Sequence, residues 1–215
     1  MLHSKMKEDR QGGFTLIELM FTVVVMAVLL GIGIPNFRDF IRNSRMSAEA
    51  NDLLSGINLT RSEAVKRRAP VVLCSGSAAA CVATGDFSDG WVVFVDTDAD
   101  GLIDVGTEDV LREHPAMPAG FSTALYETSD GEDEEDPDYD DSTASYISFG
   151  QSGFRRMTGG TLPVALGVVI CDERENALSG GGPDMSAARA LELSASGRAA
   201  ITRSQERIEI LGGCP

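Results

Sequence analysis

A single long apolar run near the amino terminus restricts the fold of this 215-residue chain more than any other feature. Between Phe14 and Ile34 the only charged side chain is Glu18, and two threonines are the only other polar residues. As a helix, these residues would extend over roughly 30 Å, which is enough to cross the hydrocarbon core of a bilayer. The run therefore predicts a membrane-spanning helix over residues 14–34.

The carboxylate of Glu18 is not explained by the two simplest kinds of apolar segment. A secretory signal peptide has an apolar centre of roughly 7 to 15 residues, whereas this run is longer and has an acid near its start. In a plain membrane anchor, a charged side chain in the apolar part of the helix would cost roughly 3 kcal/mol. We therefore interpret Glu18 as a functional residue.

A specific motif surrounds this acid. A short basic leader ends in Gly13, and the residues FTLIEL follow from Phe14. This arrangement resembles the prepilin motif of type IV pilins and of the related pseudopilins of type II secretion. The resemblance implies that a prepilin peptidase cuts after Gly13 and methylates the new amino terminus at Phe14. It also implies that Glu18 pairs with the terminal amine of a neighbouring pilin or pseudopilin subunit, since a buried carboxylate is tolerated when a buried cation meets it.

The rest of the chain is expected to form one exported domain. The net charge of −15 becomes −16 once residues 1–13 are removed, because this leader has three basic and two acidic residues. So negative a domain argues against a broad nucleic-acid-binding surface. A basic leader stays on the cytoplasmic side of a membrane, so the chain after residue 34 would face the other side. Together with the resemblance, this predicts a single-pass protein of the bacterial inner membrane with a periplasmic domain, which later joins a pilus or pseudopilus.

Beyond the membrane segment, the hydrophobic pattern changes from helical to strand-like. Over residues 35–68, small and apolar side chains recur at steps of three and four, which predicts an amphipathic continuation of the helix. Its buried face would consist of Met46, Ala50, Leu53, Ile57, Thr60 and Ala64. Residues 69–215 contain short segments rich in branched side chains, which predict strands: VVLC, GWVVFVD, SYISFG, VALGVVIC, RALELSA and RIEIL. The expected fold class is α+β, with a long amino-terminal helix packed on antiparallel β-sheet, as the resemblance to type IV pilins also implies.

Four cysteines in an exported chain indicate two disulfide bonds. Cys74 and Cys81 flank the small, flexible sequence SGSAAA, so a local bridge is expected between them. Cys171 and Cys214 would then join a later strand to the carboxyl-terminal tail, although three pairings exist in principle. A zinc site is the alternative, but neither spacing matches the paired short-loop pattern, and the chain without its leader has one histidine, His114.

Three segments between residues 57 and 201 narrow the resemblance. They read INLTRSEAVKRRAPVVLC, GWVVFVDTDADGLID and LSASGRAAI, and together they look like the GspH/FimT family of minor pilins and minor pseudopilins. Membership implies a low-abundance subunit near the fibre tip, which helps to start assembly or contacts cargo. Two fibres stay open: a type IV pilus, which we favour, and the pseudopilus of type II secretion, where the subunit would contact an exported protein.

The sequence DTDADGLID matches the first nine positions of a calcium-binding loop. The matching positions are Asp96, Asp98, Asp100, Gly101 and Asp104. The position that should hold the closing acid is Thr107, and Glu108 follows one place late. The alternative, which we favour, is a hairpin turn in which Asp and Gly supply the turn geometry. Calcium is the one cofactor that the sequence raises, and we expect none to be required.

An acidic tract occupies residues 127–141, with ten acids and no base in fifteen residues. Its charges repel one another, which predicts a solvated loop between strands. The alternative is a role in gathering cations or in contacting a basic partner.

DNA is a doubtful partner. Some members of this family resemble DNA receptors of natural transformation, in which a carboxyl-terminal G-R-x-R pattern supplies arginines to phosphate. The matching place here begins Gly197-Arg198 but has alanine instead of the second arginine. Arg203 lies five residues after Arg198, and in an extended chain this odd spacing puts the two side chains on opposite faces. Because phosphate contacts set affinity through their summed charge, DNA binding should be weak; Arg155 and Arg156 are the other candidate contacts.

No catalytic motif stands out. Without its leader the chain lacks a second histidine, a nucleophile elbow, a phosphate-binding loop and a dinucleotide fingerprint. We therefore expect a structural and interacting protein, and not an enzyme.

Overall fold

The computed structural model describes residues 13–82, 86–126, 146–156, 167–178, 184–194 and 196–214. Most of the leader and the whole acidic tract lie outside these ranges, so the expectations about them stay predictions. Contacts within the chain divide it into two units, Met1–Arg42 and Asn43–Pro215, and helix α1 (Leu16–Arg67) contributes to both.

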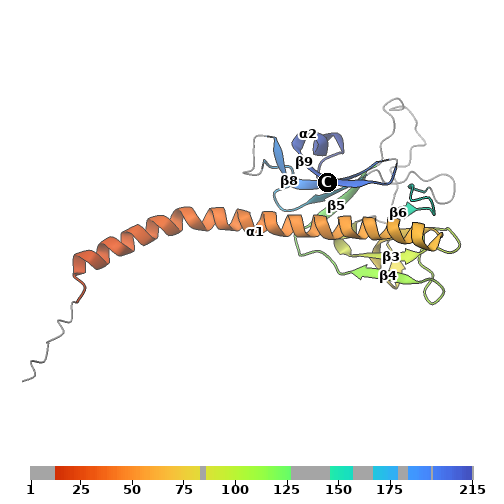
Figure 1. The fold of residues 1–215 in the computed structure, drawn as a ribbon. Coiled ribbons are helices and arrows are strands. Elements are labelled where there is room, and N and C mark those ends of the chain that lie inside the picture. Colours follow the sequence, from red (N-terminus) through yellow and green to blue (C-terminus); the bar gives the residue numbers. More distant parts are fainter. Residues whose placement is uncertain are drawn as a thin grey trace, which may run out of the picture. The chain divides into compact units, whose positions relative to one another are not determined.

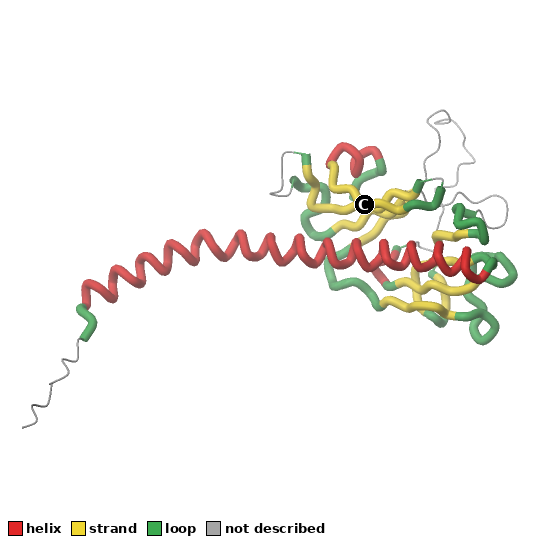
Figure 2. Tube along the Cα trace, in the orientation of Figure 1, coloured by secondary structure: helices red, strands yellow, loops and turns green. Residues whose placement is uncertain are grey.

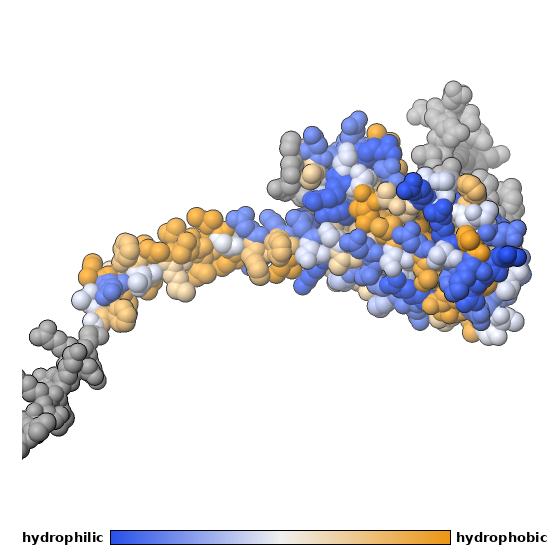
Figure 3. All heavy atoms as spheres, in the orientation of Figure 1, coloured by the Kyte–Doolittle hydropathy of each residue, from blue (hydrophilic) through white to orange (hydrophobic). Residues whose placement is uncertain are grey.

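The first unit contains the amino-terminal part of α1. From Phe14 to Ile34 every residue is exposed, and the apolar side chains form the orange surface of this segment in Figure 3. Within the described part of the chain, α1 is the one helix that is long and apolar enough to cross a membrane. An apolar surface of this extent is unfavourable in water and favourable in lipid or against other apolar helices.

In the second unit, the remainder of α1 buries one face. All six side chains of the predicted face are buried, with no more than 1% of any of them exposed. Five of them join the main hydrophobic core, and Thr60 donates a hydrogen bond from its hydroxyl to the Gly56 carbonyl at 2.8 Å. At Gly56 the helix lies so close to Trp91 that an added Cβ would be 2.7 Å from the indole ring. The predicted helical face is therefore confirmed.

After α1 the described residues form two antiparallel sheets and two short helices (Figures 1 and 2). The first sheet has the order β2-β1-β3-β4, and β6 also pairs with β1; its strands are β1 (Val71–Ser77), β2 (Ala80–Cys81), β3 (Trp91–Val95), β4 (Val110–His114) and β6 (Tyr146–Phe149). The second sheet has the order β5-β7-β8-β9; its strands are β5 (Ser122–Tyr126), β7 (Gly167–Cys171), β8 (Met185–Leu193) and β9 (Ala199–Ser204). The short helices are η1 (Phe87–Asp89) and α2 (Gln205–Ile210).

Both sheets share one main core with α1. In β1, Val71 and Leu73 join this core, whereas Val72 and Cys74 belong to a second cluster on the other face of the sheet. Strand β7 divides its side chains in the same way between the main core and a third cluster that includes residues of α2 and its end. Because side chains alternate along a strand, both faces of these central strands are buried. This is why their sequences are continuous apolar runs.

One predicted strand is wrong, because the segment RIEIL belongs to helix α2 and its carboxyl-terminal cap. Ser204 caps the start of this helix, since its hydroxyl accepts a hydrogen bond from the Arg207 amide. The helix places Ile208 and Leu211 in the third cluster, while Ile210 stays exposed. The alternating letters match a strand, but a spacing of three between buried side chains is that of a helix.

Two disulfide bonds link Cys74 to Cys81 and Cys171 to Cys214, as the sequence analysis pairs them. The first joins β1 to β2, seven residues apart. The second joins β7 to the segment after α2, 43 residues apart, and holds α2 against the second sheet. Because closing a longer loop removes more entropy from the unfolded chain, the second bond should stabilise the domain more than the first.

Candidate functional site

The predicted processing and assembly residues lie at the start of α1. Gly13 and Phe14 are exposed and precede the first helical residue, Leu16. Thr15 caps the helix, because its hydroxyl accepts a hydrogen bond from the Glu18 amide at 3.3 Å, as in the first half of a capping box. Glu18 is therefore in the first turn, where the partial positive charge of the helix end favours a carboxylate. The motif thus leaves an exposed carboxylate beside the predicted amino terminus.

The predicted metal-binding acids lie in the loop between β3 and β4. One carboxylate oxygen from each of Asp96, Asp98 and Glu108 lies within 4.8 Å of the other two. Asp100 and Asp104 are exposed and lie outside this group. The predicted set of four acids is therefore corrected: two of them come together, and the third member is Glu108. In the sequence, Glu108 could have been recognised as the acid that follows Thr107, the position at which the calcium-loop template expects its last ligand.

Hydrogen bonds from the backbone hold two of these carboxylates. Glu108 accepts from the Thr97 amide at 2.6 Å and from the Asp104 amide at 3.0 Å. Asp96 accepts from the Ala99 amide at 2.7 Å. Burial raises the pKa of the Asp96 carboxyl, and the neighbouring charge of Glu108 also raises it. The antiparallel pairing of β3 with β4 confirms the hairpin interpretation of the loop, and calcium binding stays an untested alternative.

The arginines of the predicted DNA-binding motif lie at β9. This strand begins directly after Arg198 and includes Arg203, so most of the backbone between them is extended, as the argument about opposite faces requires. Arg198 is exposed, whereas Arg203 is half-buried.

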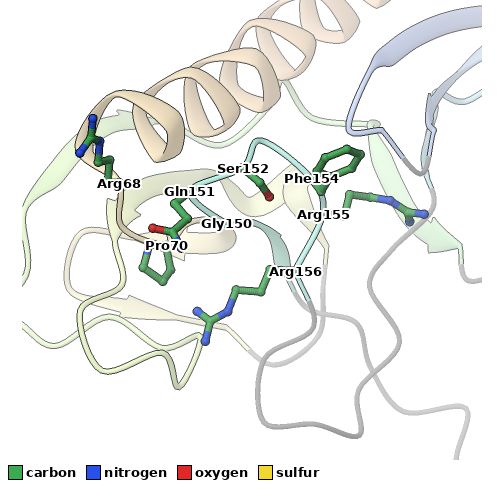
Figure 4. A pocket seen from close by; sticks show the side chains of 8 residues that line it. All are labelled: Arg68, Pro70, Gly150, Gln151, Ser152, Phe154, Arg155 and Arg156. Atoms are coloured by element: carbon green, nitrogen blue, oxygen red, sulfur yellow. The ribbon is translucent and has the colours of Figure 1, made fainter.

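Arg155 and Arg156 line a pocket of about 450 Å³ that also includes Arg68 (Figure 4). In Figure 4 the three guanidinium groups point away from one another. They therefore do not converge on a single phosphate. Gly197, which precedes Arg198, lies against the Gly153 carbonyl, two residues before Arg155, so the two sets of arginines lie on neighbouring segments.

A cluster around Trp91 connects the helix to the first sheet and was not predicted. The His114 ring stacks on Trp91 with 4.8 Å between ring centroids, and the Arg112 guanidinium lies 5.0 Å from the centre of the indole. Asp52 of α1 lies 3.7 Å from Arg112 and 3.9 Å from His114. Burial raises the pKa of the nearby Glu49 carboxyl, while His114 opposes this shift. These contacts join α1 to β3 and β4, which is a structural role.

Comparisons with known sequences agree with the prepilin motif. A family model for the prokaryotic N-terminal methylation motif matches residues 9–34. The chain is 44% identical over 39 residues to prepilin peptidase-dependent protein D of Escherichia coli (strain K12), covering 18% of this chain and 27% of that protein. It is 31% identical over 64 residues to the type IV major alpha-pilin of Moraxella bovis, covering 30% and 40%. The chain thus spans about a quarter to two fifths of the length of these curated relatives.

Two solved structures are similar to this one over most of their length. The type IV minor pilin FimU of Pseudomonas aeruginosa (strain PAO1) is 18% identical, with 76% of this chain and 92% of that chain covered and a TM-score of 0.46. The minor pseudopilin EpsH from the type 2 secretion system of Vibrio cholerae is 10% identical, with 74% and 97% covered and a TM-score of 0.42.

The family itself is shown by a match to the globular domain. A family model described as type II transport protein GspH matches residues 49–197, which is well over half of the chain. This match includes the buried stripe of α1 from Ala50 onward, the first sheet with the loop between β3 and β4, and strands β5, β7 and β8 of the second sheet. The chain therefore belongs to the GspH family of minor pilins and minor pseudopilins, and it carries the N-terminal methylation motif of these proteins.

Proposed function

We propose that this chain is a minor subunit of a type IV pilus and that it enters the fibre through the amino-terminal part of α1. The observation that carries the proposal is the exposed apolar surface from Phe14 to Ile34, with its single charged side chain, Glu18. This surface has no partner among the described residues of its own chain. It fits two surroundings, which are lipid before assembly and the helices of other subunits afterwards.

Processing would create the partner that Glu18 requires. Prepilin peptidase would cut after Gly13 and methylate the amine of Phe14, which places a cation near the first turn of α1 in every subunit. In lipid, an unpaired carboxylate costs roughly 3 kcal/mol. Pairing with the amine of an adjacent subunit would remove this cost, so assembly is favoured over the isolated subunit.

The location and the partners of the chain follow from this assignment. Until assembly, the chain would be a single-pass protein of the inner membrane with its second unit in the periplasm. The two disulfide bonds support an oxidising compartment. Prepilin peptidase and other pilin subunits would be the partners, and we assign no catalytic activity.

The second candidate is the pseudopilus of type II secretion, in which the subunit would contact an exported protein. The description of the matching family as type II transport protein GspH favours it. Deletion of the gene separates the two fibres. Loss of surface pili with normal secretion would support the pilus, whereas loss of secretion with normal pili would support the pseudopilus. A DNA receptor has less support, because the arginines of the pocket in Figure 4 point apart.

Two measurements test the assembly mechanism. Mass spectrometry of the protein from native membranes should give a chain that begins at N-methylated Phe14 and lacks four hydrogens because of the two disulfide bonds. The variant Glu18→Ala should be processed normally but be nearly absent from sheared fibres, since roughly 3 kcal/mol corresponds to about a hundredfold in an equilibrium.

Thr22→Ala is the matched control on the same helix, because the Thr22 hydroxyl donates only within the helix, to the Leu19 carbonyl. It should enter fibres normally. A native chain that begins elsewhere, or normal incorporation of Glu18→Ala, would contradict the proposal.

A further inference from the structure

The loop between β3 and β4 gathers negative charge at one point of the second unit. One oxygen from each of Asp96, Asp98 and Glu108 lies within 4.8 Å of the other two. Asp96 and Glu108 are buried and Asp98 is exposed, so the group is closed by protein on one side and reaches solvent at Asp98. Three carboxylates this close repel one another unless a proton or a cation lies between them.

The buried carboxylate of Asp96 has one oxygen without a hydrogen-bond partner among the described residues. The side chain of Asp96 is 0% exposed, and its Oδ1 accepts a hydrogen bond from the Ala99 amide. Its Oδ2 is buried and has no hydrogen-bond partner within the described residues. A buried carboxylate oxygen without a partner is costly, since it has lost its water.

Among the residues that the structure describes, no lysine, arginine or histidine is paired with these carboxylates. None of the ion pairs between described residues includes Asp96, Asp98 or Glu108. A cation bound between the three carboxylates would supply the partner for Oδ2 and remove their mutual repulsion.

The backbone positions these groups before any ligand binds. Glu108 Oε1 accepts hydrogen bonds from the amide and the hydroxyl of Thr97, and Oε2 accepts one from the Asp104 amide, which leaves Oε2 a second lone pair for a metal. Gly101 has a φ of +81°, and a Cβ there would lie 2.8 Å from the Tyr146 ring, so the loop packs directly on β6. A site with ligands already in place loses little conformational entropy on binding.

We propose that Asp96, Asp98 and Glu108 form a calcium-binding site whose coordination is completed by water. Calcium takes roughly six to eight oxygen ligands in a flexible geometry, with carboxylates prominent among them. The loop begins like a calcium loop, DTDADG, but closes one residue later than the usual template, at Glu108 instead of Thr107. Bound calcium would hold the loop on the outer face of the first sheet.

Titration of the full-length chain in detergent, after metals have been removed with EDTA, tests this site. Isothermal titration with CaCl2 should give one saturable site per chain, with a Kd of about 10⁻⁴ to 10⁻³ M, as in extracellular modules. The affinity for magnesium should be at least about tenfold lower than that for calcium, because magnesium requires a stricter octahedral geometry. At ten times the Kd, calcium should increase the folding equilibrium constant about elevenfold, which raises Tm.

Asp98→Ala is the decisive variant, because Asp98 is exposed, its replacement leaves the buried groups in place, and alanine, unlike asparagine, offers calcium no side-chain oxygen. It should lose both the heat of calcium binding and the rise in Tm. Asp100→Asn is the matched control in the same loop, since an asparagine oxygen can still accept the Leu102 amide. This control should keep both signals.

Three results would overturn the proposal. Calcium binding that is unchanged in Asp98→Ala would place the ion elsewhere, such as on the acidic tract at 127–141. No saturable signal up to about 10 mM calcium, well above the expected Kd, would exclude the site. An equal response to magnesium would indicate general screening of charge.

Discussion

The two halves of helix α1 share a backbone conformation but differ in what surrounds them. From Phe14 to Ile34, apolar side chains cover the whole helix and none is buried. From Asn43 to Arg67, the buried side chains form one stripe. The first half therefore depends on lipid or on other subunits, and the second depends on the core of its own domain. The distribution of apolar residues around the helix, and not the helix itself, decides which surroundings each half requires.

The largest difference in the free energy of unfolding is expected when leucine is replaced by alanine in each half of α1. Leu53 is 0% exposed and Leu29 is 66% exposed. Leu53→Ala should lower the free energy of unfolding by about 2–5 kcal/mol, because it leaves a cavity in the core. Leu29→Ala should change it by less than about 0.5 kcal/mol. Urea unfolding of the full chain in detergent, followed by the fluorescence of Trp91, reports on the second unit alone, since Trp91 is the only tryptophan. Equal effects of the two variants would show that the first half of α1 also contributes to the stability of the domain.

A pair of glycines should give a smaller contrast in the same assay. A Cβ at Gly56 would lie 2.7 Å from the ring of Trp91, which is fully buried and stacked on His114. Gly56→Ala should therefore destabilise the domain by about 1–2 kcal/mol, despite the better helix propensity of alanine. At Gly33 nothing lies within 4 Å of such a Cβ, so Gly33→Ala should leave the unfolding of the domain unchanged. A stabilised Gly56→Ala variant would show that the indole can move aside.

The smallest expected effect is on how the free energy of unfolding of the domain depends on pH. Burial raises the pKa of the Glu49 carboxyl above its ordinary value. A carboxyl whose pKa is higher in the folded chain lowers stability as pH rises through that pKa. Glu49→Gln should therefore stabilise the domain at pH 7, by about a few tenths of a kcal/mol after screening by solvent, and should have little effect near pH 4.

Glu63 is the matched control on the same helix, with the opposite sign. Hydrogen bonds from Arg67 and Lys66 lower the pKa of the Glu63 carboxyl. A carboxyl whose pKa is lower in the folded chain stabilises that chain when the pH is above the ordinary pKa of the carboxyl. This stabilisation is lost as the pH falls through the lowered pKa. Glu63→Gln should therefore be slightly destabilising at pH 7. If both variants shift stability in one direction, burial is not what distinguishes the two acids.

The strands that were not predicted from the sequence share a position at the edges of the sheets. Apart from the two-residue β2, they are β4, β5 and β9, and each lies at the end of the strand order of its sheet. An edge strand has one neighbouring strand and leaves part of its surface to solvent, so it does not need a continuous apolar run. Their sequences, VLREH, STALY and AAITRS, mix polar and apolar residues accordingly. The central strands β1, β3 and β7 are buried on both faces and were predicted from their apolar runs.

Features that depend on neighbours along the chain could be predicted from the sequence. These are the apolar helix, the buried stripe and the bridge between Cys74 and Cys81. Helical periodicity relates residues three or four positions apart, and the two cysteines are only seven residues apart.

Features that depend on residues far apart in the chain could be read only from the folded structure. The segment RIEIL is a helix because Ile208 can pack in the cluster on the outer side of the second sheet. Glu108 joins Asp96 and Asp98 because the loop folds back on itself and packs on Tyr146 of β6. The physical reason is that strand pairing and side-chain packing are set by contacts across the fold, which no local pattern in the sequence contains.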